Sequence, residues 1–167
     1  AISSQNLGNV RLLLMYGADV NVRNERMQNA LHIACLEVHI RREESYETIK
    51  TLLERSPQLS AVDQFGNSAL HVRSQSMEYV SNQYGDVMFE CLCKCMNPNI
   101  VNKKGQTPLH TLIEQKQVDL YDLKRILDSG VNPNLVDNNW RTALHIAAMN
   151  KKYSEMEELL TSEDRIM

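Results

Sequence analysis

The chain has 167 residues, of which 43% are hydrophobic and 5% aromatic, and its formal net charge is −3 at pH 7. The length suits one domain, and no apolar run reaches the roughly 20 residues that a membrane-spanning helix needs. Because the net charge is mildly negative, no long-range field attracts nucleic acid or an anionic membrane, so we expect no nucleic-acid partner and no membrane insertion.

In chain order, a four-residue pattern recurs that consists of a small polar residue, Ala or Pro, Leu and His. It occupies residues 29–32, 68–71, 107–110 and 142–145, and its histidines are 39, 39 and 35 residues apart. A period of this length predicts a stack of repeated units. The small polar residue of each copy can cap the start of a helix, and the leucine then points into the layer.

A second helix in each unit is predicted by Leu-rich stretches, which begin at Leu12, Leu52, Cys91 and Ile126. Gly17 and Gly130 lie where two of these helices end, at a position that favours the left-handed backbone that glycine adopts at low cost. An extended segment follows each stretch. Each unit is therefore expected to contain a helix, a turn, a second helix and a protruding loop.

This organisation resembles the ankyrin repeat, through Thr107, Pro108, Leu109 and His110 and through the segment 17–21 (GADVN). The resemblance covers almost the whole chain and implies an all-α solenoid of about five helix-pair units with protruding hairpin loops. Residues 1–167 would form one domain with units at about 1–27, 28–66, 67–105, 106–140 and 141–167, the outer two incomplete. We expect the chain to be a fragment of a longer protein and a monomer in that form.

Three units are longer than the regular ankyrin unit of about 33 residues. The second and third units carry about six extra residues each, within 37–46 and 77–85, between their two helices, and the fourth carries about two. We expect these additions to lengthen helices or to enlarge the turn between them, on the side away from the loops.

No chemistry beyond binding is indicated by the sequence. Nucleophile–base pairs, glycine-rich phosphate loops and paired catalytic carboxylates are not recognisable, so we expect no enzyme activity, no cofactor and no metal. The four motif histidines are interpreted as structural, each bonding a neighbouring hydroxyl or the backbone, because a neutral imidazole both donates and accepts.

The cysteines form one cluster, Cys91, Cys93 and Cys95, with Cys35 apart from it. On a helix Cys91 and Cys95 share a face and Cys93 points the other way, so the three cannot converge on an ion. Small buried side chains are the favoured interpretation, and a redox-sensitive thiol is the alternative. Since neither a disulfide framework nor a signal peptide is visible, we expect a cytoplasmic or nuclear location.

The resemblance implies a protein or peptide partner, because ankyrin-like stacks bind on a concave face made by loop tips and first helices. The candidate partner-binding residues at the tips are Arg23, Arg26, Met27, Gln64, Phe65, Lys103, Lys104, Asn138, Asn139 and Trp140. Those on the first helices are Leu36, Gln75, Glu114 and Met149.

Large apolar residues at the tips have two interpretations. Met27 and Trp140 stand where the other tips keep Gly66 and Gly105. Trp140 is either an interface anchor, since Trp is frequent in binding hot spots, or a seal that folds back over the preceding helix. Both remain open for Trp140, and for Phe65 we favour the seal.

The resemblance also implies a modification, hydroxylation of the asparagine that ends the GADVN-like stretch. Asn21, Asn99 and Asn134 occupy that place, and Asn21 is the best candidate because Leu13 precedes it by eight residues. The alternative is that these asparagines bond only the loop backbone.

The expected function is therefore a non-catalytic protein-interaction module in the scaffold or regulatory part of a larger protein. Three alternatives stay open: inhibitor-of-kappa-B-like masking of a transcription factor, a ligand-sensing regulatory domain fused to an enzyme, and a viral or bacterial host-directed effector. The stretch 31–35 is similar to the first group, while Lys103 and Lys104 could meet a phosphate in the second. Irregular units with insertions suit the third.

Overall fold

The computed structural model describes residues 7–36, 42–55, 57–75 and 83–163. Within these ranges it contains nine α-helices and one isolated antiparallel bridge, between Val62 and Ser68. The helices are α1 (Leu7–Met15), α2 (Ala30–Leu36), α3 (Arg42–Leu53), α4 (Ala69–Ser74), α5 (Gln83–Cys95), α6 (Pro108–Ile113), α7 (Leu120–Asp128), α8 (Ala143–Met149) and α9 (Tyr153–Glu163). The expected all-α fold is thus confirmed.

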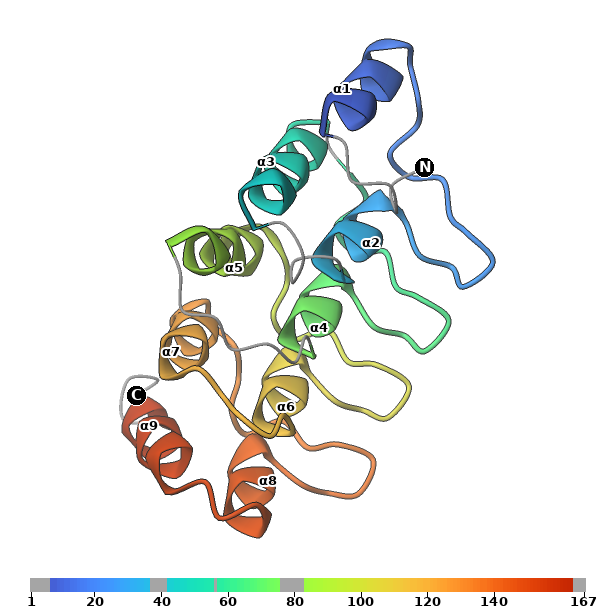
Figure 1. Ribbon diagram of the computed structural model, residues 1–167. Helices are drawn as coiled ribbons and strands as arrows, with labels where there is room; N and C mark the ends of the chain where they lie inside the picture. The colour runs from blue at the N-terminus through green and yellow to red at the C-terminus, as the bar shows by residue number, and fades with distance from the viewer. Residues whose placement is uncertain (1–6, 37–41, 56, 76–82, 164–167) are drawn as a thin grey trace.

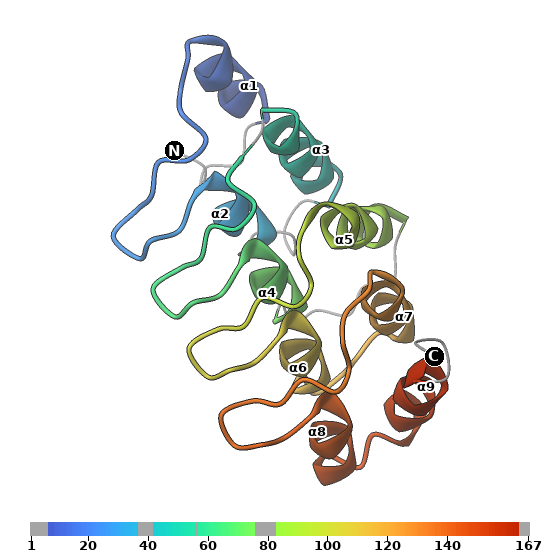
Figure 2. The same cartoon turned by 180° about the vertical axis from the view of Figure 1, so that it is seen from behind.

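The helices form two layers that run side by side along the stack (Figures 1 and 2). In one layer α2, α4, α6 and α8 contact each other in turn, and in the other α1, α3, α5, α7 and α9 do the same. The layers meet within the pairs α2–α3, α4–α5, α6–α7 and α8–α9. Each pair therefore packs on its neighbours along the chain, as the predicted solenoid requires.

The helices of the first layer begin where the repeated motif predicts. The side-chain oxygens of Ser68, Thr107 and Thr142 accept the backbone N–H of the histidine three residues later. Asn29 caps α2 in the same way through the N–H of His32. These bonds satisfy N–H groups that have no acceptor inside the helix, so each start is defined by local chemistry.

The motif leucines point into the space between the layers. Leu31, Leu70 and Leu109 are at most 1% exposed, and Leu144 is partly buried against the same core. Phe89 of α5 is fully buried among them from the second layer. The core is continuous along the stack but thin, so the stability of each unit depends on the units beside it.

The longer units show their extra length partly as helix. Helices α3 and α5 have 12 and 13 residues, whereas α7 of the shorter fourth unit has 9. The remainder of both additions, residues 37–41 and 76–82, lies outside the described residues. The expectation that the additions lengthen helices is confirmed for the part that the structure describes.

Four hairpins project from the edge of the stack beside α2, α4, α6 and α8 (Figure 1). We call their turns tip 1 (23–27), tip 2 (62–66), tip 3 (101–105) and tip 4 (136–140). Each tip directly precedes the capped start of a first-layer helix, so the position of the tip is tied to the motif.

Candidate functional site

The four tips share one construction. In each, a side-chain oxygen accepts the backbone N–H groups of the residues two and four positions later, at 2.8–3.0 Å. The residue that supplies it is buried in tips 2, 3 and 4 and exposed in tip 1. The residues that supply this oxygen are Asn24, Asp63, Asn102 and Asp137. Because each turn is held by its own side chain, its outer residues are free to face solvent.

Backbone hydrogen bonds join each tip to the next. The N–H of Gln64 donates to the carbonyl of Arg26, that of Lys103 to Phe65, and that of Asn138 to Lys104, each at 2.9 Å. The side chain of Asn138 adds a bond to the carbonyl of Lys103 at 3.0 Å. The tips therefore form one connected row, with their order fixed by main-chain contacts.

Large apolar side chains are exposed on this row. Met27 is 47%, Phe65 60% and Trp140 82% exposed. The seal interpretation is therefore wrong for Trp140, and the preference for a seal at Phe65 is also wrong, because neither side chain is buried over its preceding helix. Exposed apolar residues are common on protein surfaces, and three of them lie here on one edge of the stack.

Two of these residues hold a backbone conformation that glycine occupies in the other tips. Met27 has φ 61° and Trp140 has φ 60°, at the positions where Gly66 and Gly105 have φ 80° and 73°. For a residue with a side chain, the left-handed region costs about 1–2 kcal/mol. Such strain at an exposed position is typical of functional sites, where the side chain is retained for another purpose than stability.

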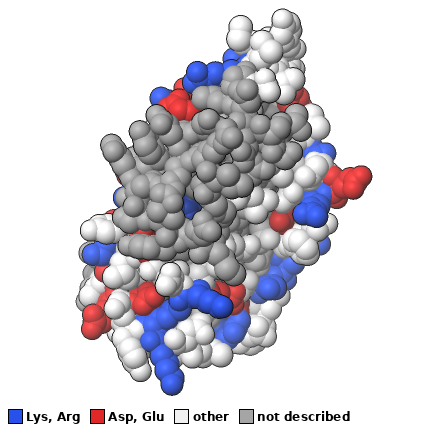
Figure 3. Space-filling view, in the orientation of Figure 1, with Lys and Arg blue, Asp and Glu red and all other residues white. Residues whose placement is uncertain are grey.

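Basic side chains lie on the same edge. Arg26, Lys103 and Lys104 are exposed, and the half-buried Arg23 donates to Gln58 Oε1 at 3.1 Å. Figure 3 shows basic groups along its right-hand border, where the hairpins of Figure 1 end. Gln64 and Asn139 are exposed polar neighbours in this row.

The predicted helix positions lie farther from the tips. Leu36 and Met149 are 44% and 67% exposed at the carboxyl ends of α2 and α8, which are seven residues long. At 1.5 Å per residue, these ends lie about 10 Å from the helix starts next to the tips. Gln75 is half-buried at the end of α4.

Glu114, at the end of α6, is connected to the base of tip 3. Its Oε1 accepts Gln106 Nε2 at 2.7 Å and lies 3.7 Å from a guanidinium nitrogen of Arg141. Arg141 also pairs with the buried Asp137 at 2.6 Å. Burial opposes ionisation of Asp137, but the hydrogen bonds from Arg141 and from the Asn139 N–H hold its pKa below the ordinary value.

Sequence reasoning missed two exposed side chains of the tips. Val101 and Val136 are 50% and 41% exposed, each directly before the residue that holds its turn. The alternation of side chains along an extended segment could have identified them, because the turn residue that follows points inward.

The motif histidines bond hydroxyls or the backbone, as the structural interpretation predicted, and three of them also link successive units, which it did not predict. The Nε2 atoms of His32, His71 and His110 lie 3.0, 2.8 and 3.0 Å from backbone carbonyls of the next unit, those of Asn67, Gln106 and Arg141. The Nδ1 atoms of His71, His110 and His145 face the hydroxyl of their own helix cap at 2.7–2.8 Å. His145 is exposed.

Burial lowers the pKa of three of these histidines, and that of His71 falls to about 4. They point to different carbonyls and do not converge. Among the described residues, no three His, Cys, Asp or Glu side chains are placed to hold a metal ion.

The cysteines differ in burial. Cys93 and Cys35 are buried, and burial raises the pKa of each thiol to about 12, which keeps them protonated and unreactive. Cys91 is half-buried and Cys95 exposed. The interpretation as buried apolar side chains is therefore correct for Cys93 and wrong for Cys95, although the predicted helix faces are right.

Two of the asparagines proposed for hydroxylation connect adjacent units. Asn21 Oδ1 accepts the N–H of Gln58, and Asn99 Oδ1 accepts the N–H of Asn132, both at 2.7 Å. Asn134 is exposed. Asn21 and Asn99 therefore bond the backbone, as the alternative expects, and hydroxylation of all three asparagines stays a prediction.

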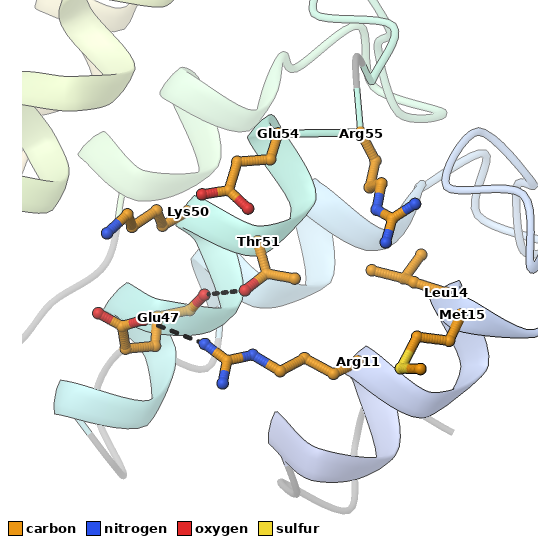
Figure 4. Close-up of a pocket in the computed structure, with 8 residues that line it drawn as sticks. All are labelled: Arg11, Leu14, Met15, Glu47, Lys50, Thr51, Glu54 and Arg55. Atoms are coloured by element: carbon orange, nitrogen blue, oxygen red, sulfur yellow. Dashed lines mark hydrogen bonds and ion pairs between the residues drawn. The ribbon is translucent and has the colours of Figure 1, made fainter.

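The second layer contains a hollow of about 290 Å³ between α1 and α3 (Figure 4). It is lined by Arg11, Leu14, Met15, Glu47, Lys50, Thr51, Glu54 and Arg55. Arg11 and Glu47 approach each other to 3.4 Å across it. Because basic and acidic groups alternate in this open hollow, it offers no defined charge to a ligand.

Comparisons with known proteins agree with the geometry. A family model described as ankyrin repeats (three copies) matches residues 76–166, more than half of the chain. Over 193 residues the chain is 30% identical to an ankyrin repeat protein of Acanthamoeba polyphaga mimivirus, covering 87% of this chain and 33% of that protein.

Two other similarities are weaker. Over 148 residues the chain is 25% identical to the nuclear factor NF-kappa-B p105 subunit of Gallus gallus, covering 86% of this chain and 14% of that protein. Over 68 residues it is 32% identical to an ankyrin repeat protein of fowlpox virus, covering 41% of this chain and 9% of that protein. The chain thus spans about a third or less of each relative. Within the described residues, no helix is both long and apolar enough to cross a membrane.

Proposed function

The chain belongs to the ankyrin-repeat family, whose members generally mediate protein–protein interaction, and from this premise we propose that it binds a protein partner on its row of hairpin tips. The binding is non-catalytic, and the chain acts as the interaction part of a scaffold or regulatory protein. The free thiols of its described cysteines suit a reducing compartment, so we place this role in the cytoplasm or nucleus.

The single observation that carries the proposal is the state of Met27 and Trp140. Both expose large apolar side chains, and both keep a left-handed backbone that glycine occupies in tips 2 and 3. The left-handed backbone of these two residues destabilises the fold, and their exposed side chains do not offset it by burial. A partner that buries the side chains accounts for their presence. Phe65, 60% exposed in tip 2, adds a second aromatic group to the same row.

The proposal is tested by capturing proteins from a cell lysate with the chain and with its Phe65→Ala/Trp140→Ala variant. A matched control is Tyr121→Ala/Tyr153→Ala, which removes aromatics that are 64% and 70% exposed on α7 and α9, in the other layer. We expect at least one protein whose capture falls about tenfold with the first variant and is unchanged with the control.

Direct binding of the purified captured protein must then show the same difference. Capture that is equal for all three forms of the chain, or that depends equally on Tyr121 and Tyr153, contradicts a partner-binding role for the tips.

A second candidate is masking of a transcription factor, as an inhibitor-of-kappa-B-like module would do. The 25% identity to the nuclear factor NF-kappa-B subunit, over 86% of this chain, favours it. The purified chain should then bind a nuclear factor NF-kappa-B protein and reduce its binding to DNA in a mobility-shift assay. A chain that leaves DNA binding unchanged excludes this candidate and leaves the tip-binding proposal intact. The relatives from mimivirus and fowlpox virus keep a host-directed viral role as a further prediction.

A further inference from the structure

Along the row, basic side chains lie only in tips 1 and 3, and aromatic side chains only in tips 2 and 4. Tip 1 presents Arg26 beside Met27, tip 2 presents Phe65, tip 3 presents Lys103 with Lys104, and tip 4 presents Trp140. We propose that the segment bound here is acidic and extended, with carboxylates that face tips 1 and 3 and apolar side chains that face tips 2 and 4. This inference rests on the proposed function and names the partner's chemistry.

The positive charge of the tips is local. Four basic side chains, Arg23, Arg26, Lys103 and Lys104, are at least partly exposed in the described tips, against one exposed carboxylate, Glu25. The chain as a whole carries −3, so the acidic excess lies elsewhere. Opposite potentials across an interface raise the association rate and exclude partners of the same sign.

The other carboxylates of the tips serve the turns. Asp63 accepts the N–H groups of Phe65 and Asn67 at 2.8 Å and is 8% exposed. Asp137 is 4% exposed and is paired with Arg141. Because both point into the protein, they do not present their charge on the outer side of the row.

The spacing of the two lysines is fixed by the backbone. Lys103 donates its N–H to Phe65 in tip 2, and Lys104 accepts the N–H of Asn138 in tip 4. The basic pair therefore lies between the tips that carry the two aromatics. A partner that satisfies the lysines is brought against Phe65 on one side and Trp140 on the other.

A nucleic-acid ligand fits these observations less well. Stacking aromatics with basic groups can bind single strands, but such sites use a continuous basic groove. Here the basic tips are separated by tip 2, which presents no charge on its outer side, Glu25 lies beside Arg26, and the chain is negative overall. A segment that alternates acidic and apolar residues matches the row better than a uniformly charged backbone does.

The experiment selects binders from a displayed library of random peptides of about 16 residues, which spans the row when extended at up to about 3.3 Å per residue. The chain is the bait, and the Phe65→Ala/Trp140→Ala variant removes binders that do not depend on the tips. We expect the remaining peptides to be enriched in Asp and Glu that alternate with apolar residues.

A selected peptide is then measured in solution by fluorescence anisotropy. The Lys103→Glu/Lys104→Glu variant should bind it about tenfold more weakly or worse at low salt, since like charges now face each other. The control, Lys50→Glu/Lys124→Glu, changes the net charge equally on α3 and α7 and should leave affinity within about twofold.

The outcomes separate this inference from the proposed function. Tip-dependent peptides that are neutral or basic overturn the acidic partner and leave the binding role standing. A library that contains no tip-dependent peptide overturns both. If single-stranded oligothymidylate displaces the peptide more effectively than an acidic peptide does, the ligand is a nucleic-acid backbone and the inference is wrong.

Discussion

At the scale of single residues, Trp140 is expected to destabilise the fold and to contribute to partner binding, so substitutions at this position can measure the two effects apart. Its φ of 60° lies in the region that its counterparts Gly66 and Gly105 occupy as glycines. Trp140→Gly should remove about 1–2 kcal/mol of backbone strain, while the added freedom of the unfolded chain costs up to about 1 kcal/mol. We expect the variant to unfold at a higher urea concentration, by about 0.5–1 kcal/mol in free energy.

The companion variant Trp140→Ala keeps the strain and should change stability by less than about 0.5 kcal/mol, because the side chain is 82% exposed. It should still weaken partner binding by more than about 1 kcal/mol. A large loss of stability in Trp140→Ala, measured by the same urea titration, shows that the side chain contributes to packing after all.

Leu109 represents the opposite case, a residue whose whole contribution is packing. It is 0% exposed in α6, between the two layers. Leu109→Ala should lower the free energy of unfolding by roughly 2–5 kcal/mol, because it removes buried methyl groups and leaves a cavity. Leu144→Ala is the matched control, since Leu144 has the same motif position but is only partly buried. A Leu109→Ala variant that unfolds like the parent chain in thermal or urea titrations contradicts the inward assignment.

At the scale of elements, the hairpins are stacked closely enough to require glycine in tips 2 and 3. A Cβ at Gly66 would lie 2.9 Å from the backbone nitrogen of Lys103 in the next tip. A Cβ at Gly105 would lie 2.8 Å from the backbone nitrogen of Asn138 in the next tip, and closer still to its side-chain oxygen. Gly17 has a similar φ of 82°, but a Cβ there would meet no atom within 4 Å. A substitution at Gly17 therefore adds backbone strain alone, whereas one at Gly105 adds both strain and a clash with the neighbouring hairpin.

Gly17→Ala should cost about 1–2 kcal/mol, the strain alone, and Gly105→Ala clearly more. The measurement is urea-induced unfolding followed by circular dichroism, with both variants in the same buffer. If Gly105→Ala costs no more than Gly17→Ala, the contact between tips 3 and 4 is looser than the structure describes.

The sequence predicts an element well when the interactions that form it join residues close together in the chain. The starts of α2, α4, α6 and α8 were predictable, because each cap acts within three residues of its own helix. The burial of Leu109 followed from the helical period.

The exposure of the tip aromatics did not follow from the sequence. Whether Trp140 covers the preceding helix or faces solvent depends on the direction in which the turn holds it, and Asp137 sets that direction through two backbone bonds. The connection of the tips into a row was equally hidden, because its hydrogen bonds join residues 34 or more positions apart. The basic row is readable only after those bonds have placed Lys103 beside Phe65.

At the scale of the whole molecule, three histidines connect the units in series. The Nε2 of His71 lies 2.8 Å from the carbonyl of Gln106, which can only accept, so Nε2 carries the proton. Its Nδ1 must then accept, and the backbone N–H of Ser68 donates to it at 3.2 Å. A proton on Nδ1 would point toward the backbone N–H of Ser68, and that N–H would lose its acceptor. His110 has the same arrangement, with the carbonyl of Arg141 at Nε2 and the N–H of Thr107 at Nδ1, so these two links favour neutral imidazole. At His32, by contrast, Nδ1 faces the side-chain oxygen of Asn29 at 2.6 Å.

This arrangement makes the stability of the stack depend on pH. Burial lowers the pKa of His71 from 6.5 to about 4 and lowers those of His32 and His110 in the same direction. Between these values the unfolded chain binds protons that the folded chain does not, so stability is complete above about pH 6.5 and falls as the pH decreases toward 4. At 1.36 kcal/mol per pKa unit, His71 alone contributes about 3 kcal/mol to this loss.

Urea titrations at a series of pH values between 7.5 and 4 measure how steeply the free energy of unfolding falls with pH. The variant His71→Gln removes one titrating group. Its free energy of unfolding should therefore depend less steeply on pH, even if its stability at pH 7.5 is lower. The imidazole Cε1–H of His71 should titrate by NMR near pH 4 in the folded chain, which tests the cause without reference to stability. A titration near 6.5, or an unchanged slope in His71→Gln, would mean that the link between units tolerates the charged ring, and that the acid sensitivity of the stack has another origin.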